Sequence, residues 1–390
     1  MRIALYGGSF NPPHTGHRAA ALTVMEKLRP DRLLILPDCL PPHKELPEGS
    51  PSAEERLHLC GLCFAGIPGL EISDMEIRRG GRSYTSVTVE RIRERYPKDE
   101  LILVVGSDML LSFEEWKRFR YLLEQCTLAV LCRKGTERAG AEEKAAQLRE
   151  QFGASVLILP HEPVEISSGE LRELLPRRLG RELLTPEEYA EIIRRRWYGA
   201  QPELSWLREQ AYAMLKPKRV AHVAGCESEA VSLAKRWGED PELAAEAAIL
   251  HDITKKFDAE GQLRLCTRYG LCPERTELES PNVLHAITAA AFAADRFGVS
   301  EPVRSAIRWH CTGRPDMSLL EKIIWLADYI EPTRDFPGVD EARELAYRDL
   351  DLAMAKALAM TLSYVEGRGK THCIITEQAL DYYKGLTDRR

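Results

Sequence analysis

The chain has 390 residues, which is enough for two domains of ordinary size. Hydrophobic residues make up 44% and charged residues 29% of the sequence, as in typical globular proteins. The formal net charge of −6 shows no general excess of Lys and Arg, so we expect no nucleic-acid partner, while a local nucleotide site stays open. No apolar run approaches the length of a membrane span, so we expect no membrane partner.

The cysteines are scattered, and several lie in apolar runs, which is typical of reduced cytoplasmic thiols rather than a disulfide framework. Cys60 and Cys63 form a lone CxxC pair, and without a second pair we interpret it as buried helix rather than a zinc site. The sequence enters a strand-like run at once, so no signal peptide is expected. We therefore expect a cytoplasmic protein, whose oligomeric state stays open, a homo-oligomer included.

Short apolar runs alternate with helical patterns over the first half of the chain. This alternation predicts an α/β domain with an open, Rossmann-like parallel sheet and helices on both faces. In such sheets the ligand lies at the carboxyl ends of the strands. The predicted strands are 3–6, 32–36, 101–105, 127–131 and 156–159, and the predicted helices are 19–28, 53–65, 87–96 and 141–152.

A glycine- and proline-rich stretch, Gly7–His17, joins the first strand to the first helix. Strand, glycine turn and helix form the layout of a phosphate-binding loop, because glycine lets backbone N–H groups approach a polyphosphate. His14 and His17 are three residues apart, so we expect both imidazoles on one face of a helical turn.

Further polar segments follow the later strands. Pro41–Lys44 predicts a stiff loop that carries a cation. Asp108 follows the third predicted strand, and we expect a functional role because an unpaired buried carboxylate is costly. Trp116 could stack on a flat ring or pack in the core. Ser167 and Ser168 should open a helix and present hydroxyl and N–H groups to an anion, with Arg172 one turn along.

These segments resemble, in order and spacing, the bacterial nicotinate-mononucleotide adenylyltransferases of the HxGH nucleotidyltransferase superfamily. Asn11 stands where that family usually has Asp, and Gly169 stands where Thr is common, which leaves one hydroxyl contact in doubt. A pantetheine-phosphate adenylyltransferase is a competing interpretation, since its HxGH loop is similar. A cytidylyltransferase fits less well, because its C-terminal motif differs.

The resemblance implies transfer of an adenylyl group from ATP, with Mg²⁺ on the polyphosphate, to nicotinate mononucleotide. The attacking phosphate is already an anion, so the site need only align the reactants and stabilise charge. His14, His17 and Arg172 would be catalytic. The residues implied in substrate binding are Gly7, Gly8, Ser9, Phe10, Pro42, His43, Lys44, Tyr84, Thr85, Gly106, Asp108, Trp116, Ser167 and Ser168.

Beyond Trp197–Pro202 the strand alternation stops and Ala-rich helical patterns dominate, which predicts an all-α domain. We expect a nucleotidyltransferase domain over 1–197, a linker over 198–204 and a second domain over 205–390. The predicted helices of the second domain are 220–237, 241–250, 282–297, 301–309, 319–330 and 350–363.

Six residues of metal-ligand type are spread over the helices of this second half. The adjacent pair His251-Asp252 ends an apolar helix, and burying two ionisable groups there calls for a compensating partner. His and carboxylate ligands suit a divalent transition metal. The six candidates are His222, His251, Asp252, His285, His310 and Asp328.

This half, and residues 309–339 in particular, resembles the bacterial HD-superfamily hydrolases that split diadenosine tetraphosphate symmetrically into two ADP. The resemblance implies two divalent metals, typically iron. Asp252 would bridge the two cations, which together activate water. In that family's pattern His222, His251 and Asp328 surround one metal, His285 and His310 hold the other, and Lys255 and Arg314 contact phosphate. Another HD phosphohydrolase, acting on a nucleoside monophosphate or a guanosine alarmone, and a non-catalytic regulatory module remain alternatives.

Overall fold

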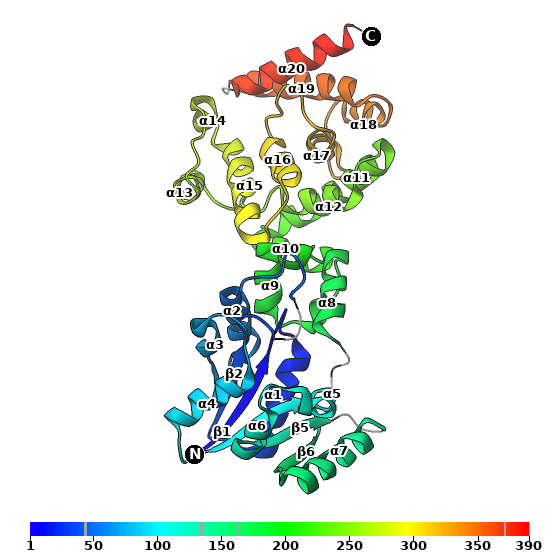
Figure 1. The fold of residues 1–390 in the computed structure, drawn as a ribbon. Helices are drawn as coiled ribbons and strands as arrows, with labels where there is room; N and C mark the ends of the chain where they lie inside the picture. The colour runs from blue at the N-terminus through cyan, green and yellow to red at the C-terminus, as the bar shows by residue number, and fades with distance from the viewer. Residues whose placement is uncertain (43–44, 133–135, 163, 165, 370–371, 390) are drawn as a thin grey trace. The chain divides into compact units, whose positions relative to one another are not determined.

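A computed structural model describes residues 1–390 except 43–44, 133–135, 163, 165, 370–371 and 390. The chain divides into two compact units, Met1–Gln201 and Pro202–Arg390, which are described separately here (Figure 1). His43 and Lys44, both predicted to bind substrate, lie outside the described residues.

The described residues of the first unit form a six-stranded sheet with strand order β3-β2-β1-β4-β5-β6. Every neighbouring pair is parallel, which confirms the predicted open parallel sheet. The three-residue edge strand β3 was not predicted, because so short a run has no readable alternation. The strands are β1 (Arg2–Gly8), β2 (Arg32–Pro37), β3 (Leu70–Ile72), β4 (Glu100–Gly106), β5 (Thr127–Cys132) and β6 (Val156–Pro160).

Alternate strand residues point to opposite faces of this sheet, and each face has its own core. Ile3 and Leu5 pack with α4, α5, α6 and α7. Ala4, between them, packs with α1 and α2 on the other face. Both faces are thus buried, as an all-parallel sheet requires. The helices are α1 (Thr15–Leu28), α2 (Ala53–Cys63), α3 (Met75–Arg79), α4 (Thr85–Arg95), α5 (Ser107–Leu111), α6 (Phe119–Gln125), α7 (Thr136–Phe152), α8 (Ser168–Leu174) and α9 (Pro186–Arg195).

The strand order reverses between β1 and β4, which lie side by side. The loops that leave these two strands diverge, one to α1 and the other to α5. A crevice at the carboxyl ends of the strands is the usual ligand position in such a sheet. The stretch Gly7–His17 and the turn at Gly106 therefore lie where a nucleotide would be expected.

Part of the predicted linker is folded into the first unit. Trp197–Gly199 forms a 3₁₀ turn, and the hydroxyl of Tyr198 donates to Oδ1 of Asn11 over 2.8 Å. The contact-based division of the chain falls at Gln201. The C-terminal end of this unit thus reaches back to the loop that follows β1.

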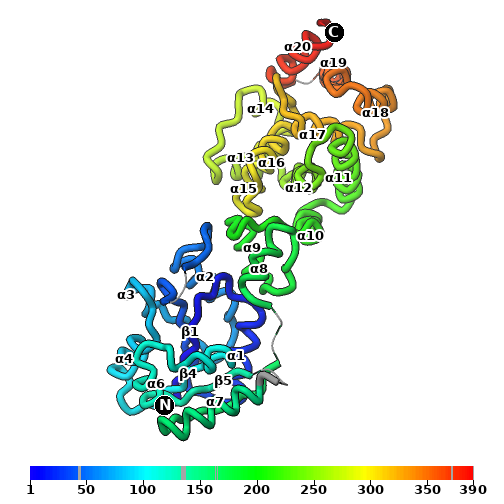
Figure 2. Tube along the Cα trace, turned by 45° about the vertical axis from the view of Figure 1, so that its right-hand side comes forward, coloured from blue at the N-terminus to red at the C-terminus, as the bar shows by residue number. Residues whose placement is uncertain are grey.

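The described residues of the second unit are helical and contain no strand, so the all-α prediction is confirmed. Helix α11 packs against α12 and α17, and α16 packs against α15 and α17 (Figure 2). Among the described residues, no helix combines the length and the apolarity needed to span a bilayer. The helices are α10 (Leu204–Met214), α11 (Pro217–Trp237), α12 (Pro241–Leu250), α13 (Ala259–Tyr269), α14 (Arg275–Glu279), α15 (Leu284–Phe297), α16 (Glu301–Trp309), α17 (Leu319–Ile330), α18 (Val339–Arg348), α19 (Leu350–Gly367) and α20 (Ile374–Thr387).

We predict that a cut between Gln201 and Pro202 yields two fragments that each fold, because each unit has its own core. Each fragment should show a cooperative thermal transition by circular dichroism. A fragment 1–184, which lacks α9, is the control. It should fail to fold, because it loses the fully buried side chains of Tyr189, Ile192 and Ile193, each contributing about 1.5–3 kcal/mol. If both fragments from the cut between Gln201 and Pro202 were unfolded, the interpretation of the chain as two independently folding units would be contradicted.

Candidate active sites

In the first unit the two motif histidines lie against each other at the start of α1. His14 is the residue before the helix, and its Nδ1 atom accepts the N–H of Gly16 over 3.1 Å. The ring centroids of His14 and His17 are 3.9 Å apart, so the expected proximity is found although His14 caps the helix rather than lying within it. A Cβ atom at Gly16 would lie 2.9 Å from the His14 ring, so only glycine fits there.

Both imidazoles are neutral near pH 7. Burial lowers the pKa of His14 to about 4, and burial together with the neighbouring His14 holds the pKa of His17 well below its usual value. Because Nδ1 of His14 accepts a hydrogen bond, its proton resides on Nε2. His14 therefore offers an N–H donor of the kind that phosphate oxygens accept.

Helix α8 brings the predicted serines and arginine to the same loop. The hydroxyl of Ser168 donates to the carbonyl of Pro12 over 2.8 Å, and Arg172 donates to the carbonyl of Asn11. Ser167 caps the helix, and its hydroxyl is bonded within a capping box with Glu170. Ser168 and Arg172 thus join the histidine loop, whereas the Ser167 hydroxyl already has a structural role.

The structure places the other predicted residues around the sheet edge with different roles. Asp108 is exposed in the first turn of α5, so it is not a core residue, and its expected role in substrate binding stays a prediction. Trp116 is half-buried against Phe113, with ring centroids 5.0 Å apart, and is part of the core packing. Tyr84 precedes α4, and Nζ of Lys117 lies 4.1 Å from its ring centroid. Thr85 begins the same helix.

Side-chain and backbone contacts fix the conformation of the glycine-rich stretch after β1. Phe10 is buried, packs edge-on against the His17 ring at 5.1 Å, and would lie 3.2 Å from a Cβ atom at Gly8. The hydroxyl of Ser9 donates to Asp38 over 2.6 Å. Ser9 and Phe10 therefore fix the shape of this loop. In the separate loop after β2, the carbonyl of Pro42 accepts a hydrogen bond from Arg82 over 2.6 Å. Gly7, at the end of β1, pairs in register with Leu36.

Arg56 is the main structural residue here that the sequence did not single out as a site residue. Its side chain is fully buried, donates to the carbonyl of Ser9, and pairs with Oδ1 of Asp38 over 3.0 Å. It also donates to the carbonyls of Asp38 and Cys39 over 2.8 and 3.0 Å. One guanidinium thus ties the loop after β1 to the loop after β2.

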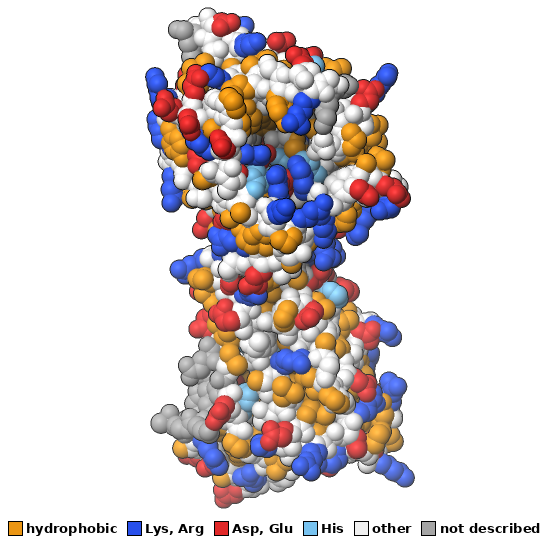
Figure 3. All heavy atoms as spheres, turned by 180° about the vertical axis from the view of Figure 1, so that it is seen from behind, with side chains coloured by type: hydrophobic (Ala, Val, Ile, Leu, Met, Phe, Trp, Pro, Cys, Tyr) orange, Lys and Arg blue, Asp and Glu red, His pale blue; other side chains and the backbone are white. Residues whose placement is uncertain are grey.

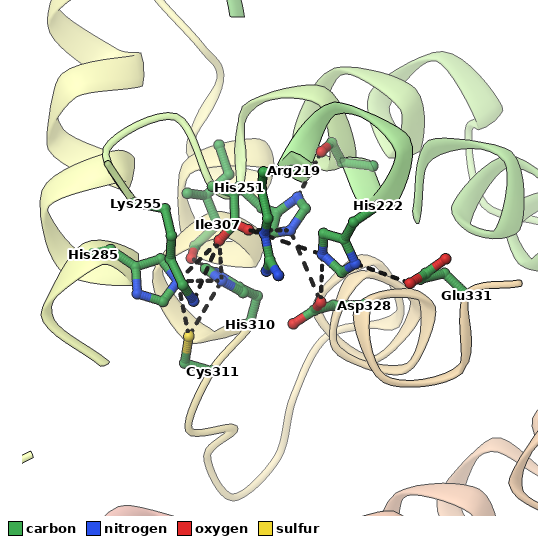
Figure 4. Close-up of polar contacts among 12 residues, drawn as sticks. Arg219, His222, His251, Lys255, His285, Ile307, His310, Cys311, Asp328 and Glu331 are labelled. Atoms are coloured by element: carbon green, nitrogen blue, oxygen red, sulfur yellow. Dashed lines mark hydrogen bonds and ion pairs between the residues drawn. The ribbon is translucent and has the colours of Figure 1, made fainter. Parts of the chain in front are cut away.

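In the second unit the six predicted ligands come together from α11, α15, α17 and the segments that directly follow α12 and α16. Figure 4 labels five of them, His222, His251, His285, His310 and Asp328. One group contains His222, His251 and Asp328, with Nε2 of His222 3.0 Å from Oδ1 of Asp328. The other contains His285 and His310, whose Nε2 atoms are 3.2 Å apart. A third group, His251 with Asp252 and His310, overlaps these two, so the predicted division of the histidines between two metals stays a prediction.

Asp252 lies between the two groups, and each carboxylate oxygen faces one of them. Oδ2 is 3.9 Å from Nε2 of His222 and 3.6 Å from Nε2 of His251. Oδ1 is 3.0 Å from Nε2 of His285 and 3.8 Å from Nε2 of His310. A single carboxylate can therefore serve both groups.

All four histidines use Nδ1 for a hydrogen bond away from the cluster. The partners are backbone carbonyls for three of them, at 2.6 Å for His251, 2.6 Å for His285 and 2.7 Å for His310. His222 instead contacts Oε1 of Glu331 at 3.0 Å. Since Nδ1 carries the proton, each Nε2 presents a lone pair to the centre, which is the arrangement that metal-ligating histidines adopt.

The chemistry of this donor set fits divalent cations. Nε2 of His222, Nε2 of His251 and Oδ1 of Asp252 are buried without a hydrogen-bond partner, which is costly unless something else binds them. Burial alone would raise the pKa of Asp252, but the pKa lies well below its usual range, with the Lys255 ammonium among the neighbours that lower it. The carboxylate is therefore ionised and available as a ligand.

Cationic side chains lie around the cluster. Arg219 pairs with Asp252, Arg334 lies 2.7 Å from Asp328, and Nζ of Lys255 lies 3.7 Å from Asp252 and 2.9 Å from Nε2 of His285. Figure 3 shows Lys and Arg side chains around histidines in a hollow of this unit's surface. Lys255 is 37% exposed and can turn toward solvent. Arg314, in contrast, pairs with the buried Glu321 at 2.9 Å and so has a structural partner.

Comparison with known proteins places each unit in a family. A cytidylyltransferase-like model matches residues 5–174, and an HD domain model matches residues 219–333. Over 189 residues, 45% of this chain, it is 35% identical to a "Probable nicotinate-nucleotide adenylyltransferase" of Syntrophotalea carbinolica, covering 86% of that protein. Over 163 residues, 40% of this chain, it is 40% identical to a "Bis(5'-nucleosyl)-tetraphosphatase, symmetrical" of Halalkalibacterium halodurans, covering 87% of that protein.

The chain belongs to both of these families. Its first unit is the adenylyltransferase unit and its second is the HD unit. The HD unit is also 36% identical to a predicted HD superfamily hydrolase of Clostridium acetobutylicum, whose crystal structure spans 48% of this chain and 97% of its own, with a TM-score of 0.45.

Sequence reasoning missed several residues of the HD unit's site. Glu331 orients His222, Arg219 and Arg334 pair with the two carboxylates, and Cys311 lies beside the second histidine pair. Glu331, Cys311 and Arg334 had a signal in the sequence, since each lies within the stretch 309–339 that carries the resemblance, whereas Arg219 lies outside it. Arg219 has no such signal, because in the sequence it is one basic residue among several at the start of a helical pattern.

We predict that Arg56→Ala lowers the free energy of unfolding of the adenylyltransferase unit by about 3–5 kcal/mol, because it leaves the Asp38 carboxylate without its buried partner. Urea unfolding of fragment 1–201 measures this change. Arg118→Ala is the control, since its pair with Glu90 is exposed and should be worth about 0–1 kcal/mol. Equal effects of the two substitutions would contradict the assigned role of Arg56.

Proposed function

We propose that the chain is a bifunctional enzyme: its first unit forms nicotinate adenine dinucleotide and pyrophosphate from ATP and nicotinate mononucleotide, and its second splits diadenosine tetraphosphate into two ADP. The observation that carries the first activity is the close pair His14 and His17, with ring centroids 3.9 Å apart, at the sheet's switch point. The observation that carries the second is Asp252, with one oxygen toward each ligand group.

In the adenylyltransferase unit the residues act by binding and charge stabilisation. The phosphate of the mononucleotide attacks the α-phosphorus of ATP, and pyrophosphate leaves. His14 and His17 would donate to phosphate oxygens, and Arg172 adds a fixed positive charge beside the same loop. Mg²⁺ would be held mainly by the substrate phosphates. The adenylyltransferase relative of Syntrophotalea carbinolica, whose name describes a nicotinate nucleotide as substrate, supports nicotinate mononucleotide as the acceptor.

In the HD unit His222, His251 and Asp328 would hold one cation, His285 and His310 the other, and Asp252 both. Two such cations supply a water nucleophile at neutral pH and neutralise phosphate charge. Glu331 and the backbone carbonyls keep the imidazoles in the ligating tautomer. Lys255 and Arg219, beside the cluster, would bind phosphate oxygens of the substrate. The arrangement gives no preference between iron and other divalent metals of similar size, and iron remains the choice that the family suggests.

We predict that His17→Ala lowers adenylyl transfer by about 10²-fold or more, because it removes a donor to charge that develops on the phosphates. The measurement is formation of nicotinate adenine dinucleotide by the full chain, with hydrolysis of diadenosine tetraphosphate expected to stay unchanged. His58→Ala, at an exposed histidine of α2, is the control and should be silent. Wild-type turnover in the His17 variant, or a wild-type chain that prefers phosphopantetheine, would reject the assignment.

We predict that Asp252→Asn releases at least one metal ion per chain and abolishes hydrolysis, because the amide removes the charge that both ligand groups share. Metal content and both activities are measured side by side, and adenylyl transfer should survive. Asp340→Ala, at an 89% exposed aspartate of α18, controls for loss of surface charge. A variant that keeps both metals and full hydrolysis would overturn the bridging role. A metal-loaded wild type that leaves diadenosine tetraphosphate intact would instead favour another HD phosphohydrolase or a regulatory module.

A further inference from the structure

The thiol of Cys311 completes a triangle with the second histidine pair. Its Sγ atom lies 3.3 Å from Nε2 of His285 and 3.2 Å from Nε2 of His310. The two Nε2 atoms are 3.2 Å from each other. These three atoms belong to one of the clusters whose donor atoms are close enough to share a cation.

The triangle has the dimensions of one face of a tetrahedral metal site. Metal–nitrogen distances of about 2.0–2.1 Å and a metal–sulfur distance of about 2.3 Å put neighbouring tetrahedral ligand atoms about 3.3–3.6 Å apart. Asp252 lies near the two histidines of this triangle, since its Oδ1 atom is 3.0 Å from Nε2 of His285 and 3.8 Å from Nε2 of His310, but it does not group with Cys311. The three separations within the triangle are slightly short, so a bound cation would spread these ligands by a few tenths of an ångström.

We propose that Cys311 is a thiolate ligand of the metal held by His285 and His310, so that these three residues supply two nitrogens and one sulfur to this site. The inference rests on the metal centre of the proposed function and adds a ligand to it. Binding of the cation would release the thiol proton to solvent.

This ligand would make the two metal positions chemically different. The cluster of His222, His251 and Asp328 offers only nitrogen and oxygen among the described residues. A thiolate favours Fe²⁺, Co²⁺ or Zn²⁺ over Mg²⁺ or Mn²⁺, because the harder cations prefer oxygen ligands. The position at Cys311 should therefore discriminate more strongly against hard cations than the other one does.

Cys311 is also reachable from solvent. It is half-buried and lines a cavity of about 370 Å³ with Asn282, Thr312 and His372. Its position on this wall means that a small alkylating reagent can reach the sulfur unless a metal covers it.

Cobalt spectroscopy tests the proposal on the full chain. The metal-free protein is titrated with Co²⁺, and a sulfur-to-cobalt charge-transfer band in the near ultraviolet is expected as the Cys311 position fills. Cys311→Ser should abolish the band and weaken that position by at least ~10-fold, the lower end of what losing even an orienting partner costs. Cys272→Ser, at an exposed cysteine of the same unit, should leave the band intact, and so should Cys226→Ala, at a buried cysteine one turn from His222 on α11.

A second measurement needs no variant. In the metal-free wild type, iodoacetamide should label Cys311, and loading with Co²⁺ should protect it by roughly the fraction of sites filled, while Cys272 is labelled in both forms. A chain that binds two cobalt ions and cleaves diadenosine tetraphosphate without the band or the protection would overturn the Cys311 ligand and leave the proposed function standing. A chain that binds no cobalt at all would overturn both.

Discussion

The chemistry of both units depends on which ring nitrogen of each histidine carries the proton. In the HD unit every cluster histidine donates from Nδ1, so Nε2 is left as a lone pair. In the adenylyltransferase unit Nδ1 of His14 accepts a backbone N–H, so Nε2 is left as a donor. The same side chain thus offers a ligand for cations in one unit and a partner for anions in the other. In each case the choice is made by the local backbone and not by the ring itself.

The backbone that makes this choice is fixed by few contacts. In the adenylyltransferase unit, Gly16 allows the His14 ring to lie over the first turn of α1, and Arg56 holds the loop beneath it. In the HD unit the carbonyls that orient three of the histidines lie three residues before each ring, at the ends or starts of helices. The ligand set is therefore built near helix termini, and for His251 and His310 the orienting carbonyl lies in the last turn of a helix, where carbonyl groups lack a helical partner.

Much of the fold was readable from the sequence because its signals are local. Helices α12, α16 and α17 begin and end where the pattern predicted, since a Pro or a Ser cap marks each start. The six candidate metal ligands could be picked out because histidines are rare in that half. The exposure and the contacts of individual side chains could not be predicted from the sequence. Asp108 is exposed at a helix start. Arg314 pairs with Glu321, a contact that depends on the path of the loop between α16 and α17. The edge strand β3 is too short to leave a pattern.

The boundary between Gln201 and Pro202 joins the two units in one polypeptide. Synthesis of the chain therefore makes them in a fixed one-to-one ratio, which neither gene dosage nor translation can change. Only one of the two units carries a built cluster of metal ligands among the described residues. If the proposed activities hold, the ratio of working sites in a cell would be set by how fully that cluster is metallated. Iron or zinc supply would then adjust the balance between making a dinucleotide and degrading one, without any change in the amount of protein.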